Sequence, residues 1–346
     1  MKKTLLLCGL LVLALALPAW AAIPITTLYN TGVDDSGQLL TSGPDSHYKI
    51  VAVGQASYTD ASGIPVIQPL NPIYTVALPR IPVVAVNPPT WAWVPNGPTS
   101  NWIGPIAGIN YGCGDSAGVD DYGKYIYQGV WTYQTTFDLT GLDPKTVHIA
   151  GHWGTDDPGW MYLNLANPNV LNPSHLVVSG GGFNTLPSFD ISGTNGLFLP
   201  GLNTLTFVVW DAGNCVTGLR LDLEYATAER AVRYVPIDIK PGSFPNSVNL
   251  GSEGKLPVAI LSLPDFDART VDVSTVTLSN ASVVIKNNGS FMAAAEDVNG
   301  DGLLDLVVHV PTENLIIDTQ GGEAVLKGKT LDGLDIEGAD YIKVVP

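Results

Sequence analysis

The sequence predicts an all-β protein, with a large jelly-roll domain followed by a smaller β-sandwich. Three observations support this fold class. The chain holds 37 glycines and 26 prolines among 346 residues, a share typical of proteins in which many turns join short strands. Segments that alternate apolar and polar residues recur, whereas no stretch after residue 21 keeps the apolar spacing of a helix over three turns. Hydrophobic residues make up 45% of the chain, enough to fill a buried core in each domain.

Charged residues are few and mostly acidic. Against 16 Lys or Arg stand 32 Asp or Glu, for a net charge of −16. Intrinsic disorder is excluded because disordered chains combine low hydrophobicity with high charge density. Nucleic acid is excluded as a partner because an acidic surface repels a phosphate backbone. The composition therefore indicates a folded, acidic protein and leaves its ligand open.

The first 21 residues predict a secretory signal peptide. Lys2 and Lys3 form a short basic region, an apolar run follows over Thr4–Leu17, and small residues stand at Ala19 and Ala21. A retained membrane anchor is the alternative, but the run is short for a span of about 20 residues and a cleavage site follows it. We therefore expect a secreted, extracellular or cell-surface protein that keeps no transmembrane anchor after cleavage.

The three cysteines divide between the signal peptide and the mature chain. Cys8 could mark a lipoprotein signal, but it lies early in the apolar run and follows the bulky Leu7 where a small residue is required. Cys113 and Cys215 remain, each beside glycine and asparagine or aspartate as in loops. In an oxidising compartment these two residues predict one disulfide bond. Two free, buried thiols are the alternative.

Strand patterns fill most of the mature chain. In the clearest, Leu219–Tyr225, leucines alternate with Arg220 and two acidic residues, so the leucines are predicted to face the core and the charges the solvent. Further strands are predicted at Tyr125–Phe137, Val147–Trp153, Leu205–Trp210, Ser282–Lys286 and Leu304–Val310. The proline-rich segment Pro65–Pro98 predicts an irregular covering loop. A polar stretch within Ala226–Val235 predicts the boundary between a domain at 22–230 and a domain at 231–346.

The sharpest chemical motif is Asp297–Asp305, which reads D-x-N-x-D-G-x-x-D, the first nine positions of an EF-hand-type loop. Alternate side-chain oxygens converge on one cation while the chain curls around it, and Gly302 permits the sharp turn. An all-oxygen set favours Ca²⁺ over Zn²⁺. The predicted calcium ligands are Asp297, Asn299, Asp301, the carbonyl of Leu303, and Asp305.

Two features distinguish this motif from an EF-hand. Position twelve is Val308, where an EF-hand has a bidentate Glu, and a strand pattern rather than a helix follows the loop. The motif therefore predicts a structural calcium loop between strands. A metal-free Asx turn is the alternative, because Asn-Gly and Asp-Gly form turns without a cation.

Five segments of the second domain resemble a module common in secreted bacterial proteins. They are Val235–Leu250, Lys255–Leu261, Phe266–Val276, Glu296–Gly302 and Leu326–Gly333. The resemblance covers nearly all of 235–346 and implies an Ig-like β-sandwich appendage, often placed after other extracellular domains.

The first domain resembles the galactose-binding-like jelly rolls of PEP-CTERM-type, choice-of-anchor-like surface proteins of bacteria. Tyr133–Leu142, Gly151–Asp157 and Asn203–Val208 carry this resemblance, which implies a domain that binds or presents rather than catalyses. The chain stops at Tyr341–Pro346 without a Pro-Glu-Pro motif or a terminal apolar helix, so sorting by that route is not expected.

Aromatic and acidic residues supply the remaining candidates. Trp91, Trp93 and Trp102 lie among prolines and glycines and predict a ligand site on which sugar rings stack; core packing is the alternative. The pair Asp156-Asp157 suggests glycoside hydrolysis, but neighbouring strand residues point to opposite faces and a turn explains the pair, so no catalytic residue is predicted. A second calcium site in the first domain, at Asp34-Asp35 or Asp120-Asp121, stays open.

The sequence thus predicts a secreted, non-enzymatic cell-surface or matrix protein, stabilised by Ca²⁺, that binds carbohydrate or extracellular matrix. The alternatives are a glycan-active hydrolase without a recognisable motif and a purely structural surface component. The oligomeric state is not predicted.

Overall fold

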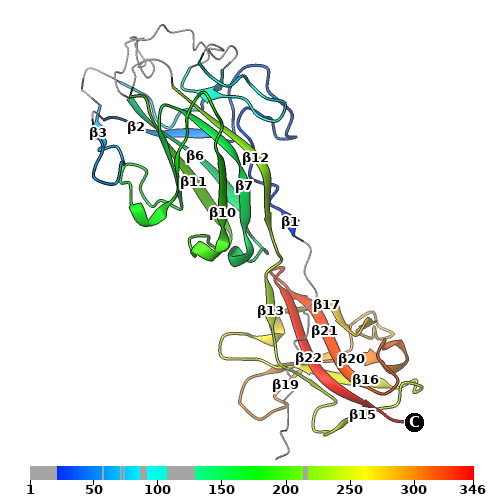
Figure 1. Ribbon diagram of the computed structural model, residues 1–346. Helices are drawn as coiled ribbons and strands as arrows, with labels where there is room; N and C mark the ends of the chain where they lie inside the picture. Colours follow the sequence, from blue (N-terminus) through cyan, green and yellow to red (C-terminus); the bar gives the residue numbers. More distant parts are fainter. Residues whose placement is uncertain are drawn as a thin grey trace, which may run out of the picture.

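The computed structural model describes residues 22–56, 58–70, 72, 75–85, 92–106, 129–212 and 217–346. In these residues the chain forms 22 strands, five single-turn 3-10 helices and no α-helix, which confirms the all-β prediction. The strands build two bodies, one after the other along the chain (Figure 1). None of the described segments is a helix long and apolar enough to cross a membrane.

Two six-stranded sheets form the first sandwich. One has the order β10-β7-β12-β5-β4, with β1 also paired to β12, and the other has the order β3-β2-β6-β11-β8-β9. Their bounds are β1 Ile23–Pro24, β2 Lys49–Gln55, β3 Gln68–Pro69, β4 Val83–Val84, β5 Ile103–Gly104, β6 Gly129–Asp138, β7 His148–Asp156, β8 Gly159–Leu163, β9 Leu176–Gly180, β10 Ser188–Ser192, β11 Leu202–Trp210 and β12 Gly218–Ala228. The turns η1 Pro144–Thr146, η2 Pro173–His175 and η3 Gly193–Asn195 join some of them.

The second sandwich has sheets of six and four strands, ordered β13-β22-β21-β17-β18 and β14-β16-β20-β19, with β15 also paired to β22. Its bounds are β13 Val232–Tyr234, β14 Ile237–Ile239, β15 Asn246–Val248, β16 Lys255–Ile260, β17 Val271–Leu278, β18 Ala281–Ser282, β19 Ala293–Glu296, β20 Asp305–Pro311, β21 Gly322–Thr330 and β22 Asp335–Val344. The turns are η4 Ala268–Thr270 and η5 Thr312–Asn314. Strands β13 and β15 pair with β22 in parallel, whereas the other strand pairs of both sandwiches are antiparallel.

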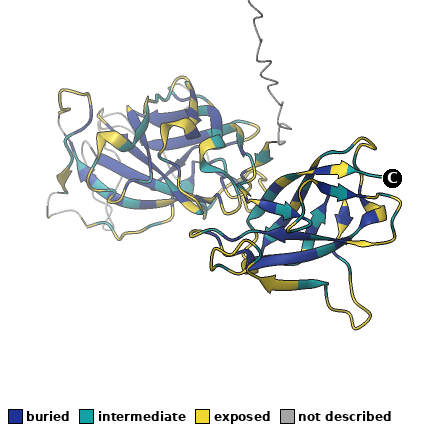
Figure 2. Ribbon diagram, turned by 90° about the horizontal axis from the view of Figure 1, so that it is seen from below, coloured by how far each residue is buried: buried dark blue, intermediate teal, exposed yellow. Residues whose placement is uncertain are grey.

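Each sandwich has its own core. In the first, Trp131, Tyr133 and Phe137 of β6 pack with Phe207 of β11 and the leucines of β12. The second core is aliphatic, and Val258, Val308 and Leu326 are fully buried in it. Figure 2 shows the buried residues along the strands of both bodies and the exposed ones in the loops. Alternate strand positions face the core, so the period-two pattern of the sequence separates the buried face of each sheet from its exposed face.

Most predicted strands occur, with shifted ends. β7 extends past Trp153 to Asp156, β11 begins at Leu202, and β20 matches the predicted Leu304–Val310 within one residue. The predicted strand Ser282–Lys286 is wrong beyond Ser282, because Ile285 instead pairs with Phe291 across a turn. Residues 125–128 of the predicted strand Tyr125–Phe137 lie outside the described part of the chain, as do the signal peptide, Trp91, Cys113 and Cys215.

One prediction for β12 is also wrong: Arg220 does not face solvent. Its side chain is buried, because residues 92–106 pass over the outer face of the sheet there. A bulge between Leu223 and Tyr225 further breaks the regular alternation. The strand was placed correctly, but its outer face is not a free surface.

The connection between the sandwiches is short and hydrogen-bonded on both sides. Asp143 N donates to Glu229 O (2.9 Å) and Ala231 N donates to Gly141 O (3.0 Å), which ties the connection to the first sandwich. The next residues form β13, which pairs with β22 of the second sandwich. No free spacer therefore separates β12 from β13 (Figure 1).

Candidate functional site

The predicted calcium loop connects β19 to β20. These strands are antiparallel neighbours, and Glu296 pairs with Asp305 at the two ends of the loop. β20 runs through the interior of its sheet, between β16 and β19. Val308, at loop position twelve, is therefore a core residue, and this explains why the position carries no ligand.

Side-chain oxygens within the loop accept its backbone N–H groups. The carboxylate of Asp297 accepts from Gly300 N (2.8 Å) and Gly302 N (3.0 Å), and Asp301 Oδ1 accepts from Leu303 N (2.8 Å). Gly300 and Gly302 have φ of +77° and +89°, a conformation that glycine adopts without steric cost. The loop thus curls around its own acidic side chains.

Asp305 is the inner residue of the site and is fully buried. Its Oδ1 accepts from Ser262 N (2.8 Å) and its Oδ2 accepts from Val298 N (3.1 Å). Ser262 is itself held in place, because its Oγ donates to Leu304 O (2.7 Å) and accepts from Ala268 N (2.9 Å). Sequence reasoning missed Ser262, since no local motif marks a single serine 43 positions before Asp305.

The loop carries the oxygen ligands that a hard cation prefers, but its side chains would have to rearrange to bind one. Asp297, Asn299 and Asp301 are exposed, and Asp305 closes the inner side. Among the described residues, no three His, Cys, Asp or Glu side chains converge on one point, because the loop aspartates turn toward backbone N–H groups. Each carboxylate oxygen has a second lone pair, so a cation could be bound while the backbone contacts persist.

Trp93 and Trp102 lie in a small core outside the first sheet, together with Ala85. Their ring centroids are 4.4 Å apart. Trp93 Nε1 donates to Asp156 Oδ2 (3.0 Å), and Trp102 Nε1 donates to Val94 O (2.8 Å). Both rings are buried, so the structure places these two residues as packing groups, whereas Trp91 lies outside the described residues.

Asp156, the first residue of the acidic pair, is a buried carboxyl group with a strongly shifted pKa. The pKa of Asp156 is raised to about 9: burial is the largest cause, the charges of Asp157 and Asp211 add to the shift, and the hydrogen bond from Trp93 opposes it. The carboxyl is therefore protonated at neutral pH. Asp157, its neighbour in the pair, accepts from Ala212 N (3.1 Å).

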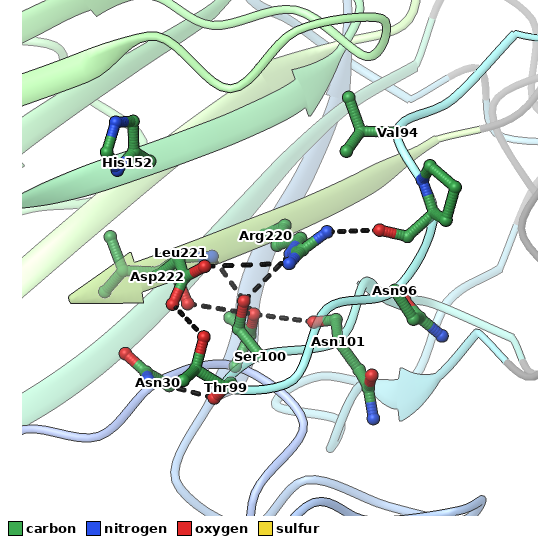
Figure 3. Close-up of polar contacts among 12 residues, drawn as sticks. Asn30, Val94, Asn96, Thr99, Ser100, Asn101, His152, Arg220, Leu221 and Asp222 are labelled. Atoms are coloured by element: carbon green, nitrogen blue, oxygen red, sulfur yellow. Dashed lines mark hydrogen bonds and ion pairs between the residues drawn. The ribbon is translucent and has the colours of Figure 1, made fainter. Parts of the chain in front are cut away.

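A buried arginine fixes the segment that carries Trp93 and Trp102 (Figure 3). Arg220 donates from Nε to Ser100 Oγ (2.8 Å) and from Nη1 to Pro95 O (2.5 Å). Thr99 Oγ1 donates to Asp222 Oδ1 (2.7 Å) at the next outward position of β12. Burial lowers the pKa of Arg220, and the nearby Asp222 opposes that shift. The network is a structural anchor for residues 92–106.

A polar pocket of about 360 Å³ opens on the first sandwich. One wall is a stack of Tyr29 on His47, with ring centroids 3.8 Å apart. His47 is held between Asp35 (Nε2 to Oδ1, 3.1 Å) and Asp45 (Nδ1 to Oδ1, 3.3 Å). The lining residues are Thr27, Tyr29, Ser46, His47, Lys49, Gln134, Thr135 and Thr136.

The comparison with protein-family models finds an FG-GAP repeat at residues 288–326. The match contains the whole loop Asp297–Asp305 together with β19 and β20. FG-GAP repeats are often associated with calcium binding. The comparison with curated proteins gave no match.

Solved structures show only slight similarity. The glycoside hydrolase domain of Endo-D from Streptococcus pneumoniae R6 is 10% identical, with a TM-score of 0.20 over 72% of this chain and 34% of that one. The adhesin domain of Epf from Streptococcus pyogenes is 8% identical, with a TM-score of 0.26 over 64% and 74%. A putative β-galactosidase from Bacteroides fragilis is 12% identical, with a TM-score of 0.23 over 88% and 41%. This chain spans about a third of the first of these structures, and no type of anchor follows from the matches.

Proposed function

We propose that this chain is an exported, non-enzymatic surface or matrix protein whose second sandwich binds Ca²⁺ and whose first sandwich binds carbohydrate or extracellular matrix. The observation that carries the proposal is the FG-GAP match over a D-x-N-x-D-G-x-x-D loop that closes a strand pair. We further assign the first body as a galactose-binding-like jelly roll and the second as an Ig-like sandwich, on the sequence resemblances.

The proposed calcium ligands are Asp297, Asn299, Asp301, the Leu303 carbonyl and Asp305. A bound cation would neutralise three carboxylates carried by one short loop. Because the site closes the β19–β20 connection, its role would be to stabilise the sandwich. Loops of this composition in extracellular modules bind Ca²⁺ with dissociation constants of about 10⁻⁴ to 10⁻³ M.

Isothermal titration of the purified full chain with CaCl₂ tests the metal site. Asp301→Ala should abolish the heat of binding. Asp318→Ala is the matched control, because Asp318 is also exposed, lies in the same repeat, and accepts a backbone N–H two residues on (Gln320 N, 2.7 Å). Heat that survives Asp301→Ala, or no heat with the unmodified chain, would contradict the assignment.

The polar pocket at Tyr29 and Lys49 supports the binding part of the proposal. It combines an aromatic ring with hydroxyl, amide and ammonium groups, the mixture that recognises a polyhydroxylated ligand. Among the described residues the Lys49 ammonium has no ion-pair partner, so it remains available to a ligand. Buried Trp93 and Trp102 give no such support.

A glycan array with and without Ca²⁺ tests this part. Binding that Lys49→Ala and Gln134→Ala weaken, and that the surface control Lys145→Ala does not, would support it. Release of reducing sugar would favour the hydrolase alternative. Absence of glycan binding together with calcium-induced self-assembly would favour a structural component.

A further inference from the structure

A second set of contacts leads away from the calcium loop toward the connection between the sandwiches. It begins at Ser262, which touches the loop twice, through its N–H on Asp305 and its Oγ on Leu304. Ser262 is buried, so these contacts are shielded from water. The side chain thus links the inner ligand of the loop to the segment that follows β16.

That segment is a tight turn. Leu263 N donates to Phe266 O (2.8 Å) and Phe266 N donates to Leu263 O (2.9 Å). Its far end returns to Ser262, whose Oγ accepts from Ala268 N. Residues 262–268 therefore form one hydrogen-bonded unit with Ser262 at its base.

The outer side of the unit holds the linker strand β13. Asp265 Oδ1 lies 2.8 Å from Arg233 Nη2, and the Arg233 guanidinium lies 5.0 Å from the centroid of the Phe266 ring. An ion pair and a cation–π contact from one turn thus fix the middle residue of β13. β13 is the segment through which the chain passes from the first sandwich into the second.

We propose that Ser262 positions Asp305 for calcium, and that calcium binding stiffens the linker strand β13 through Ser262, the 263–266 turn and Arg233. This rests on the proposed calcium site. A cation that fixes Asp305 also fixes its hydrogen-bond donor Ser262, and an ordered 262–268 unit holds Asp265 and Phe266 against Arg233. Coupling between two sites is reciprocal, so an ordered linker in turn favours calcium binding.

Amide hydrogen exchange of the full chain, in CaCl₂ and in EGTA, measures the coupling. Calcium should slow exchange of peptides covering 230–235 and 262–268 by on the order of fivefold. Peptides from β11, in the first sandwich, should not change. Calcium heat with slower exchange confined to 297–305 would overturn the coupling and leave the metal site standing, whereas absence of calcium heat would overturn both.

Two exposed aspartates of the unit provide matched variants. Asp265→Asn removes the ion pair to Arg233, and Asp267→Asn removes one to Arg269 outside the linker (Arg269 Nη2 to Asp267 Oδ2, 2.7 Å). Asp265→Asn should reduce the calcium effect on 230–235, because only the Phe266 ring then holds Arg233, and Asp267→Asn should keep it. Equal behaviour of the two variants would overturn the role of Arg233.

Ser262→Ala tests the positioning role. It removes the Oγ contacts to Leu304 O and Ala268 N but keeps the backbone N–H on Asp305. We expect a loss of calcium affinity smaller than the roughly 10–100-fold that follows removal of a ligand's direct hydrogen-bond partner. Ser274→Ala is the control, because Ser274 Oγ donates to Asp272 Oδ1 in an exposed local turn of the same sandwich. Unchanged affinity in a folded Ser262→Ala protein would overturn the role of Ser262.

Discussion

Each sandwich contains a buried aspartate, and the two carboxyl groups have different surroundings and different roles. Asp156 is 5% exposed and receives one indole N–H, from Trp93, while facing the charges of Asp157 and Asp211. Asp305 is 0% exposed and receives two backbone N–H groups, from Ser262 and Val298. Burial alone therefore does not decide the role of a carboxyl group; its donors and neighbouring charges do. The first is a protonated packing group, and the second is the anchor of a loop that presents charge.

The largest expected effect is the pH dependence caused by Asp156. Its folded pKa of about 9 lies above the ordinary 3.8, so the folded protein keeps a proton that the unfolded chain releases. The stabilisation is complete below about pH 4 and is lost as pH rises toward 9. Asp156→Asn, a neutral isostere, should remove this loss, for a relative gain on the order of 4 kcal/mol between pH 5 and pH 8. Urea unfolding of both proteins at the two pH values measures it.

The half-buried Asp143 serves as control. It caps η1 by accepting from Lys145 N (3.0 Å), and Asp143→Asn keeps that acceptor. The pH profile of this variant should follow the unmodified protein. If the pH profile of Asp156→Asn also matched that of the unmodified protein, Asp156 would not be protonated in the folded state.

Asp305→Ala should have the next largest effect. It leaves the N–H groups of buried Ser262 and half-buried Val298 without an acceptor, which costs roughly 3 kcal/mol for the two. Unfolding in EGTA isolates this loss from any contribution of calcium. Asp301→Ala removes an exposed acceptor from the same loop and should cost less than about 1 kcal/mol. Equal losses would show that Asp305 is not an anchor.

Calcium removal should have a smaller effect, limited to the second sandwich. A ligand bound only by the folded state stabilises it by RT ln(1 + [L]/Kd), about 0.4 kcal/mol at 1 mM Ca²⁺ for a dissociation constant of 10⁻³ M and about 1.4 kcal/mol for 10⁻⁴ M. Thermal melts in CaCl₂ and in EGTA measure the difference. Asp301→Ala should melt at the same temperature in both, and a calcium shift that persists in this variant would place the ion elsewhere.

The part of the site that the sequence predicted is the local part. Residues Asp297–Asp305 are recognisable because the motif depends only on residue spacing along one short loop. Strands β11 and β20 could also be predicted from the sequence, since the alternation of apolar and polar residues depends only on neighbours in the chain. Val308 breaks the EF-hand pattern, and the structure supplies the reason, which is its place in the core.

The parts that were missed depend on contacts between distant residues. Ser262 reaches Asp305 across 43 positions, and Ser100 covers Arg220 across 120. The regular alternation in β12 predicted that Arg220 faces solvent, because the sequence of that strand does not indicate that residues 92–106 cover it. Proline and glycine around Trp93 predicted a loop, but they could not tell whether the loop's rings turn outward or pack onto the sheet.

A further variant, Trp93→Phe, tests the indole donor that distinguishes Asp156 from Asp305. Phenylalanine keeps an aromatic ring in the small core with Trp102 but has no N–H for Asp156 Oδ2. Losing one such hydrogen bond costs about 1 kcal/mol. The Trp93 contact lowers the pKa of Asp156, so its loss should raise that pKa further, and the additional loss of stability should appear as the pH rises past about 9, where the carboxyl of the unmodified protein ionises. Unfolding of both proteins at about pH 7 and about pH 10, on either side of the pKa of Asp156, decides it: a loss that is the same at the two pH values would mean that Trp93 acts on Asp156 by packing alone.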